Sequence, residues 1–131
     1  EKQADGLVID SLKLIPTQSA NHFAFQLALV QQRLKKVNAS GYVEISLQGS
    51  LNDQPTSYKI GEVSTLTKKE LSFSFKYFQI VSGEFTLPEN FKPEKIIIAA
   101  VIPKGRWQKY YRLDESYDWQ PTAQIDLTNA E

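Results

Sequence analysis

Hydrophobic and polar side chains alternate with a period of two residues along much of the chain. In Leu71–Pro88, every second residue from Leu71 to Tyr77 is apolar, and the residues between them are serine or lysine. Such alternation is typical of a half-buried β-strand, here with an aromatic inner face that includes Phe73 and Phe75. Ser82-Gly83 interrupts the pattern, and the alternation then resumes as a second short strand. We expect this stretch to lie at the centre of the fold, with Phe73 and Phe75 buried.

The same pattern predicts further strands on both sides of this stretch. They cover Leu7–Ile15, Phe23–Leu29, Val43–Leu47, Tyr58–Ile60, Lys95–Ile102 and Trp107–Leu113, with a last extended piece from Trp119 through Leu127. The apolar residues of the first strand change parity near Asp10-Ser11, which indicates a β-bulge or a strand that switches between two sheets. Asn52-Asp53 favours a hairpin turn. The uninterrupted apolar run Lys95–Ile102 is typical of a strand that is covered on both sides.

These elements predict an all-β fold. About eight strands with turn residues between them, and no long helix, indicate an antiparallel β-sandwich that is immunoglobulin-like in character. The 131 residues are enough for one domain with an adequate core, so we expect a single sandwich over residues 1–131. The polar residues 1–5 form an N-terminal tail, and the absence of an initiator methionine leads us to expect that an upstream segment precedes it.

Composition narrows the function classes. The formal net charge is zero, which gives no support to nucleic-acid binding. The chain has no cysteine, which fits the cytoplasm and equally a bacterial envelope protein. The longest apolar run, Ile96–Ile102, is far too short to span a membrane.

No residue pattern indicates catalysis. His22 is the only histidine, and without a positioned partner it is read as a loop residue at a strand start. Asp114, Glu115 and Asp118 lack the glycine of a calcium loop and are expected in a solvated loop. The chain contains no Gly-x-Ser-x-Gly, phosphate loop or dinucleotide fingerprint. We therefore expect no enzyme, with no catalytic residue, cofactor or metal.

Two groups of side chains are candidates for an interaction surface. In the strand predicted over Trp107–Leu113, parity places Trp107 and Tyr111 inward and a polar strip outward. The strip consists of Arg106, Gln108, Tyr110 and Arg112. Arginine and tyrosine are enriched at binding hot spots, although an ordinary solvated strand face has the same pattern.

The second group is Phe78 and Ile80, which take the outward parity of the strand that begins at Leu71. Either a bulge shifts the parity there, or the chain presents a second apolar surface that another segment or a partner covers. The basic stretch Gln31–Lys36 predicts a strand end and hairpin, with a short helix as the alternative.

Several short motifs resemble a known family. They are Phe75–Gln79, Gly83, Leu87-Pro88, Phe91–Pro93 and Asp118-Trp119. Together they resemble the C-terminal β domain of a proteobacterial family of single-span inner-membrane proteins, in which a coiled coil precedes the β domain. The resemblance implies a periplasmic domain without catalytic residues, tethered to the inner membrane only through an N-terminal anchor.

From these observations we expect a non-catalytic protein-interaction module in the bacterial periplasm, carried by an inner-membrane protein. Its partner would be another envelope protein and not a nucleic acid, and the isolated domain would be a monomer. The alternative is a carbohydrate- or peptidoglycan-binding module, because the aromatic residues between Trp107 and Trp119 could stack on sugar rings.

Overall fold

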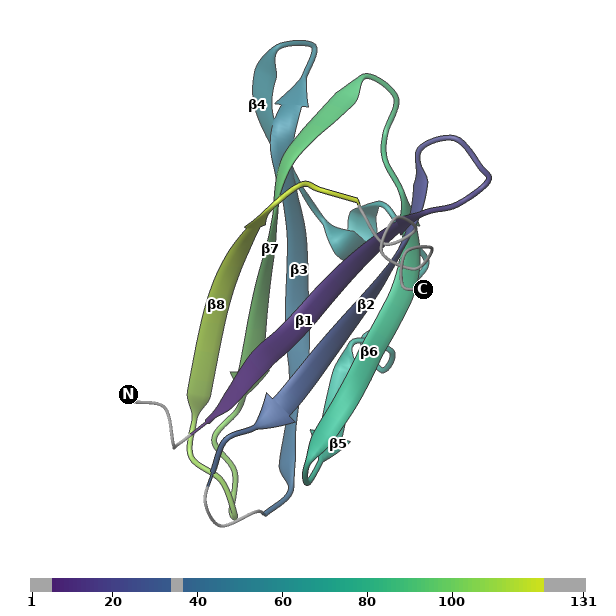
Figure 1. The fold of residues 1–131 in the computed structure, drawn as a ribbon. Helices are drawn as coiled ribbons and strands as arrows, with labels where there is room; N and C mark the ends of the chain where they lie inside the picture. Colours follow the sequence, from purple (N-terminus) through teal and green to yellow (C-terminus); the bar gives the residue numbers. More distant parts are fainter. Residues whose placement is uncertain (1–5, 34–36, 122–131) are drawn as a thin grey trace.

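The computed structural model describes residues 6–33 and 37–121. In this part of the chain, eight strands and one short 3-10 helix follow one another: β1 (Leu7–Pro16), β2 (His22–Gln31), β3 (Ala39–Leu51), β4 (Gln54–Lys59), η1 (Ile60–Glu62), β5 (Ser72–Phe75), β6 (Phe78–Thr86), β7 (Phe91–Ile102) and β8 (Tyr111–Asp118). The strands form two antiparallel sheets that pack face to face as a sandwich (Figure 1). The all-β prediction is confirmed.

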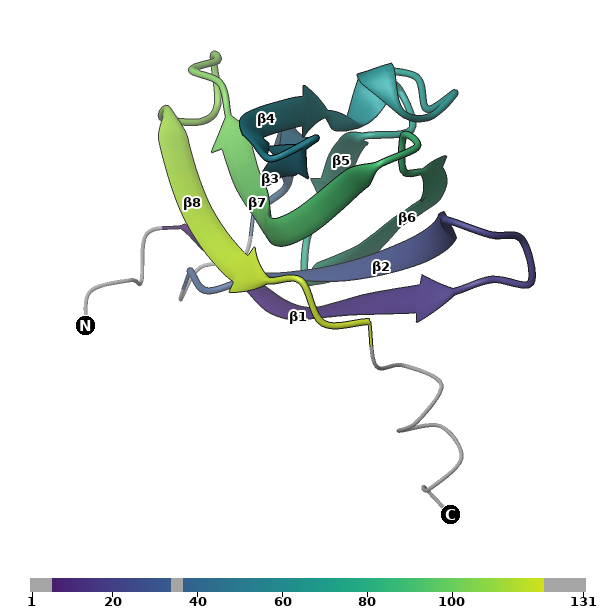
Figure 2. The same ribbon diagram turned by 90° about the horizontal axis from the view of Figure 1, so that it is seen from above.

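The two sheets divide the strands unequally. One is a three-stranded sheet of order β1-β2-β6, and the other is a five-stranded sheet of order β4-β3-β7-β8 in which β5 also pairs with β3. Seen from above, the sheets form two layers (Figure 2). In sequence order they correspond to strands A-B-E and C′-C-F-G of an immunoglobulin sandwich, which fits the predicted general character.

The change of parity in the first strand is a β-bulge. The pairing of β1 with β2 shifts register between Ile9 and Ser11. The extra residue lets Leu7 on one side of the bulge and Leu14 on the other both point into the core, where they are buried. A single strand thereby covers the core along its whole length.

In the five-stranded sheet, the predicted hairpin turn and the predicted doubly covered strand are both present. Asn52 and Asp53 join β3 to β4 with φ angles of 52° and 67°, the left-handed values that a tight two-residue hairpin requires. On β7, Ile98 lies in the core, and the outward-facing Ala99 and Val101 are buried as well. This strand is therefore covered on both faces, as its uninterrupted apolar run predicts.

The core fills the space between the inner faces of the sheets. Phe73 and Phe75 are buried, as expected. Trp119 packs edge-on against Phe23, with ring centroids 5.0 Å apart, at the end of the core opposite Phe73. Aromatic rings thus fill both ends of the sandwich.

The prediction of one strand from Leu71 and a break at Ser82-Gly83 is wrong. β5 ends at Phe75 and pairs with β3, whereas β6 begins at Phe78, pairs with β2 and runs without interruption through Ser82-Gly83. The chain crosses from one sheet to the other at Lys76-Tyr77. For this reason Tyr77 is 59% exposed and does not continue the inner face.

The boundaries of the last strand are also wrong. β8 covers Tyr111–Asp118, a range that includes the residues expected in a solvated loop, because Tyr111 pairs with Ile102 at the end of β7. The residues before it form a loop that the Gly105–Gln108 bridge closes. Trp107 lies in this loop and is 85% exposed, so it is not a core residue.

β2 ends at Gln31, which confirms the predicted strand end, but β2 and β3 belong to different sheets and therefore do not pair as the predicted hairpin. Residues 34–36 themselves lie outside the described residues, as does the extended piece beyond residue 121.

Candidate functional site

An exposed cluster of apolar side chains lies on the outer face of the three-stranded sheet. Val8, Val30 and Phe78 pair across β1, β2 and β6 in one row, and Ala28 pairs with Ile80 in the next. We call these five residues the apolar patch. Phe78 is 65% exposed and Ile80 is 44% exposed, so solvent reaches the β6 side of the patch most freely.

The patch results from regular strand geometry and not from a bulge. The pairing of β2 with β6 is in continuous register from Val30–Phe78 to His22–Thr86. Between the two exposed residues, Gln79 lies on the opposite side of β6, and its Oε1 accepts a hydrogen bond from the backbone nitrogen of Ser74 at 3.0 Å. That contact ties β6 to β5 and leaves Phe78 and Ile80 on the outside. Of the two explanations for their parity, the structure therefore supports the second apolar surface.

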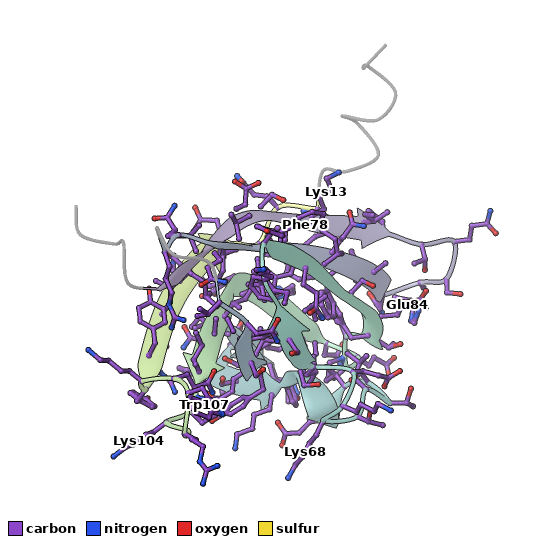
Figure 3. The ribbon with its side chains drawn as sticks, turned by 90° about the horizontal axis from the view of Figure 1, so that it is seen from below. Lys13, Lys68, Phe78, Glu84, Lys104 and Trp107 are labelled. Carbon is purple, nitrogen blue, oxygen red and sulfur yellow. The ribbon has the colours of Figure 1, made fainter. Side chains whose placement is uncertain are left out.

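Polar residues continue the same face beyond the patch. On β6, Ser82, Glu84 and Thr86 follow Phe78 and Ile80 with the same parity and are exposed. Glu84 lies far along β6 from Phe78 (Figure 3). The ring of His22 lies 2.8 Å from Glu84 Oε1 through Nε2 and 2.8 Å from the Thr86 hydroxyl through Nδ1. His22 at the start of β2 is thus hydrogen-bonded to two of the polar residues on β6.

The predicted outward strip on the last strand does not form one face. Arg106, Gln108 and Tyr110 lie in the β7–β8 loop, and Arg112 lies on β8. The Gln108 Nε2 donates to the Pro103 carbonyl at 2.8 Å and to the Ser40 carbonyl at 3.1 Å. Gln108 therefore fastens the loop to the start of β3, and its amide is not available to a partner.

Arg112 is engaged in ion pairs on the outer face of the five-stranded sheet. Its Nε lies 3.0 Å from Asp114 Oδ2, and its Nη2 lies 3.2 Å from Glu44 Oε1 on β3. The hydrogen bond to Asp114, followed by the attraction of both carboxylates, raises the pKa of Arg112 above its already high ordinary value. The guanidinium therefore stays charged and links β8 to β3 across β7.

The β7–β8 loop instead borders an open hollow of about 1130 Å³. Residues Lys104 to Tyr111 line most of it, and Gly6 and Arg33 complete the wall. Trp107 and Tyr110 stand exposed beside it, and the Arg106 guanidinium lies 5.9 Å from the Trp107 ring. Trp107 is the binding candidate that parity misassigned, because the alternation before Tyr111 belongs to a loop.

Histidine and acidic side chains are the residue types from which a metal site could be built. Within residues 6–33 and 37–121, no group of three or more histidine, cysteine, aspartate or glutamate side chains could hold a metal ion. Asp114 pairs with Arg112 on the same strand, and Asp118 pairs with Lys95 of the neighbouring strand β7 at 2.9 Å. No described helix is long and apolar enough to cross a membrane.

Comparison with known proteins finds one family. The model of DUF6776, a family of unknown function, matches residues 1–98. The matched range contains every residue of the apolar patch and most of β7, whereas the β7–β8 loop lies beyond it. No curated protein and no solved structure matches the chain.

Proposed function

The chain belongs to DUF6776, a family of unknown function, and we propose that it is a non-catalytic protein-interaction module of the bacterial periplasm, carried by an inner-membrane protein. The observation that carries the interaction role is the apolar patch, in which Phe78 and Ile80 stand exposed on an unbroken strand. A contiguous apolar patch with a polar rim is typical of a protein-binding surface. The compartment and the membrane tether rest on the family resemblance of the sequence motifs.

The chemistry of the patch defines what its partner would present. Phe78 offers a large aromatic ring, the side-chain type that can anchor an interface once its surroundings exclude water. Val8, Val30 and Ala28 extend the surface across the sheet and are partly buried. A partner with a matching apolar strip would cover the rows of the patch and leave Glu84 at the polar margin.

A second candidate function is carbohydrate or peptidoglycan binding. It is favoured by the exposed rings of Trp107 and Tyr110 beside the hollow under the β7–β8 loop. Flat aromatic rings offer stacking surfaces for sugars, and the hollow would hold more than one sugar ring. This role would use the loop and not the apolar patch.

Capture from an envelope extract distinguishes the two surfaces. Three baits are compared: the 131-residue chain, the patch variant Phe78→Ser/Ile80→Ser, and the loop variant Trp107→Ser/Tyr110→Ser. We expect the patch variant to lose one or more proteins that the loop variant retains. If only the loop variant loses ligands and those ligands are glycans, the second function replaces the first. If all three baits capture the same proteins, the patch is not the binding surface.

Both variants must be folded for this comparison. All four substituted residues are exposed, and exposed substitutions usually change stability by about 0.5 kcal/mol or less. Thermal unfolding therefore should give nearly equal midpoints for the three baits. We also expect the wild-type chain to sediment as a monomer at micromolar concentration, because the proposed partner is a different protein.

A further inference from the structure

Basic side chains gather at one end of the sandwich. The strand registers place the β2–β3, β5–β6 and β7–β8 connections together at this end, because β2, β5 and β7 all run toward it. We call the described residues of these connections the basic pole. Its cations are Arg33, Lys76, Lys104, Arg106 and Lys109, and none of its described residues is acidic.

Four of these five cations have no carboxylate partner within residues 6–33 and 37–121. Lys76, Lys104, Arg106 and Lys109 form no ion pair with a carboxylate of the described residues, whereas Lys95 and Arg112 are paired on the sheet face. In Figure 3, which views the molecule from this end, Lys104 and Trp107 project away from the strands on the same loop. The positive charge of the pole therefore faces solvent.

Exposed aromatic rings are interspersed with these cations. Trp107 is 85% exposed, and Tyr77 and Tyr110 are each 59% exposed. The Lys76 ammonium lies 5.6 Å from the Tyr77 ring. Tryptophan, tyrosine, lysine and arginine are the residues that accumulate where proteins meet the headgroup region of a bilayer.

The opposite end of the sandwich has the opposite character. Its turns are residues 17–21, 52–53 and 87–90, and they contain Asp53 and Glu89 but no lysine or arginine. Although the net charge is zero, the described connections at one end of the sandwich are basic and the turns at the other end are acidic. Such an asymmetry orients a protein in the field of a charged surface.

We propose that the basic pole docks on an anionic bilayer surface, with its lysine and arginine side chains on lipid phosphates and the Trp107 ring among the headgroups. Charge complementarity identifies the occupant, because anionic headgroups match a pole where Lys76, Lys104, Arg106 and Lys109 have no carboxylate partner among the described residues. The exposed rings favour a bilayer over a nucleic acid or an acidic protein, since they stand at the extremity of loops where the interfacial zone would receive them. This role is separate from the protein-binding role of the apolar patch, which lies on a sheet face.

Vesicle binding tests the proposal with an intrinsic reporter. The 131-residue chain is titrated with vesicles of phosphatidylcholine alone and of phosphatidylcholine mixed with phosphatidylglycerol, while tryptophan fluorescence is recorded. We expect binding only to the anionic vesicles, a shift of the emission to shorter wavelength, and loss of binding at high salt. The variant Trp107→Phe should lose the shift, because the remaining Trp119 packs against Phe23 and Phe85.

Charge variants locate the contact. Replacing Lys104, Arg106 and Lys109 by glutamine should weaken binding about 100-fold, since each cation near an anionic surface contributes roughly a factor of five. The matched variant Lys13→Gln/Lys68→Gln/Lys92→Gln removes the same charge from exposed positions elsewhere and should bind almost as the wild type does.

Three results would overturn the proposal. The first is equal binding to neutral vesicles, and the second is an equal loss in both charge variants. The third is a chain that binds soluble dextran sulfate through the same cations but leaves anionic vesicles unbound, which would assign the pole to a polyanion in solution.

Discussion

Apolar residues on the outer faces of the two sheets differ in their exposure to solvent. On the five-stranded sheet, Ala99 and Val101 of β7 point outward, yet they are only 4% and 2% exposed. Arg112 of β8 reaches across them to Glu44 of β3, because Glu44 and Asp114 both pair with Ala99 in the sheet register. The ion pair therefore spans this apolar stripe, and the methylene groups of long charged side chains are suited to cover such a surface.

The three-stranded sheet has no such cover over the β6 side of its apolar patch among the described residues. Phe78 and Ile80 lie on an outer face like Ala99 and Val101, but they are 65% and 44% exposed. One apolar stripe is therefore buried beneath the span of an ion pair, and the other is accessible. This difference in exposure is the basis of the proposed interaction role of the patch.

The largest expected effect is a difference in stability loss between a substitution in the core and one in the apolar patch. Phe73 and Phe78 are five positions apart, but Phe73 is buried and Phe78 is exposed. Phe73→Ala should lower the free energy of unfolding by about 3–5 kcal/mol, whereas Phe78→Ala should lower it by only about 0.5 kcal/mol. Denaturant unfolding measures both. Similar losses in the two variants would mean that Phe78 is not free of the core and that the comparison fails.

A smaller effect should follow from removing the cover of the five-stranded sheet. Arg112→Ala eliminates the pairs with Glu44 and Asp114 and exposes the apolar surface of β7 beneath them. We expect a lower melting temperature and weaker dependence of stability on salt. Arg106→Ala is the matched control, because Arg106 has no carboxylate partner among the described residues. Equal melting temperatures for the two variants would show that the ion pairs do not contribute to the cover.

The smallest effect concerns pH at the inner side of β8. Burial, and then the nearby Glu115 carboxylate, raise the pKa of Tyr117 above its ordinary value of 10.0. A group with a raised pKa in the folded state contributes its full stability below the unfolded value and loses it as pH rises through the folded value. Stability should therefore fall above pH 10.0, and Tyr117→Phe should lessen that fall. Urea midpoints measured on both sides of that pH give the result, and parallel curves for the two proteins would refute it.

Local pattern was sufficient for most of the fold. The Asn52-Asp53 turn and the doubly covered β7 each follow from a few consecutive residues, and the parity change near Asp10-Ser11 reduced the first strand to a bulge or a change of sheet. The crossing at Lys76-Tyr77 could not be predicted in this way, because β5 and β6 acquire different partners that lie far away in sequence.

The candidate sites also differ in whether local pattern or pairing between distant strands reveals them. Phe78 and Ile80 could be found by parity alone, since outward apolar residues on a strand are visible in a single sequence. Val8, Ala28 and Val30 join them only through the pairing of β1, β2 and β6. Trp107 was misassigned because the loop after β7 imitates strand alternation, and only the pairing of Tyr111 with Ile102 fixes where β8 begins.

The central claim, that a partner covers the apolar patch, can be tested by cysteine labelling in the envelope. The chain has no cysteine of its own, so Ile80→Cys and Glu84→Cys each provide one thiol on the outer face of β6. In the purified chain both thiols should react rapidly with a maleimide. In intact bacterial envelopes, the account predicts that the cysteine at position 80 is protected and the one at position 84 still reacts. Equal labelling of the two positions in the envelope would contradict it.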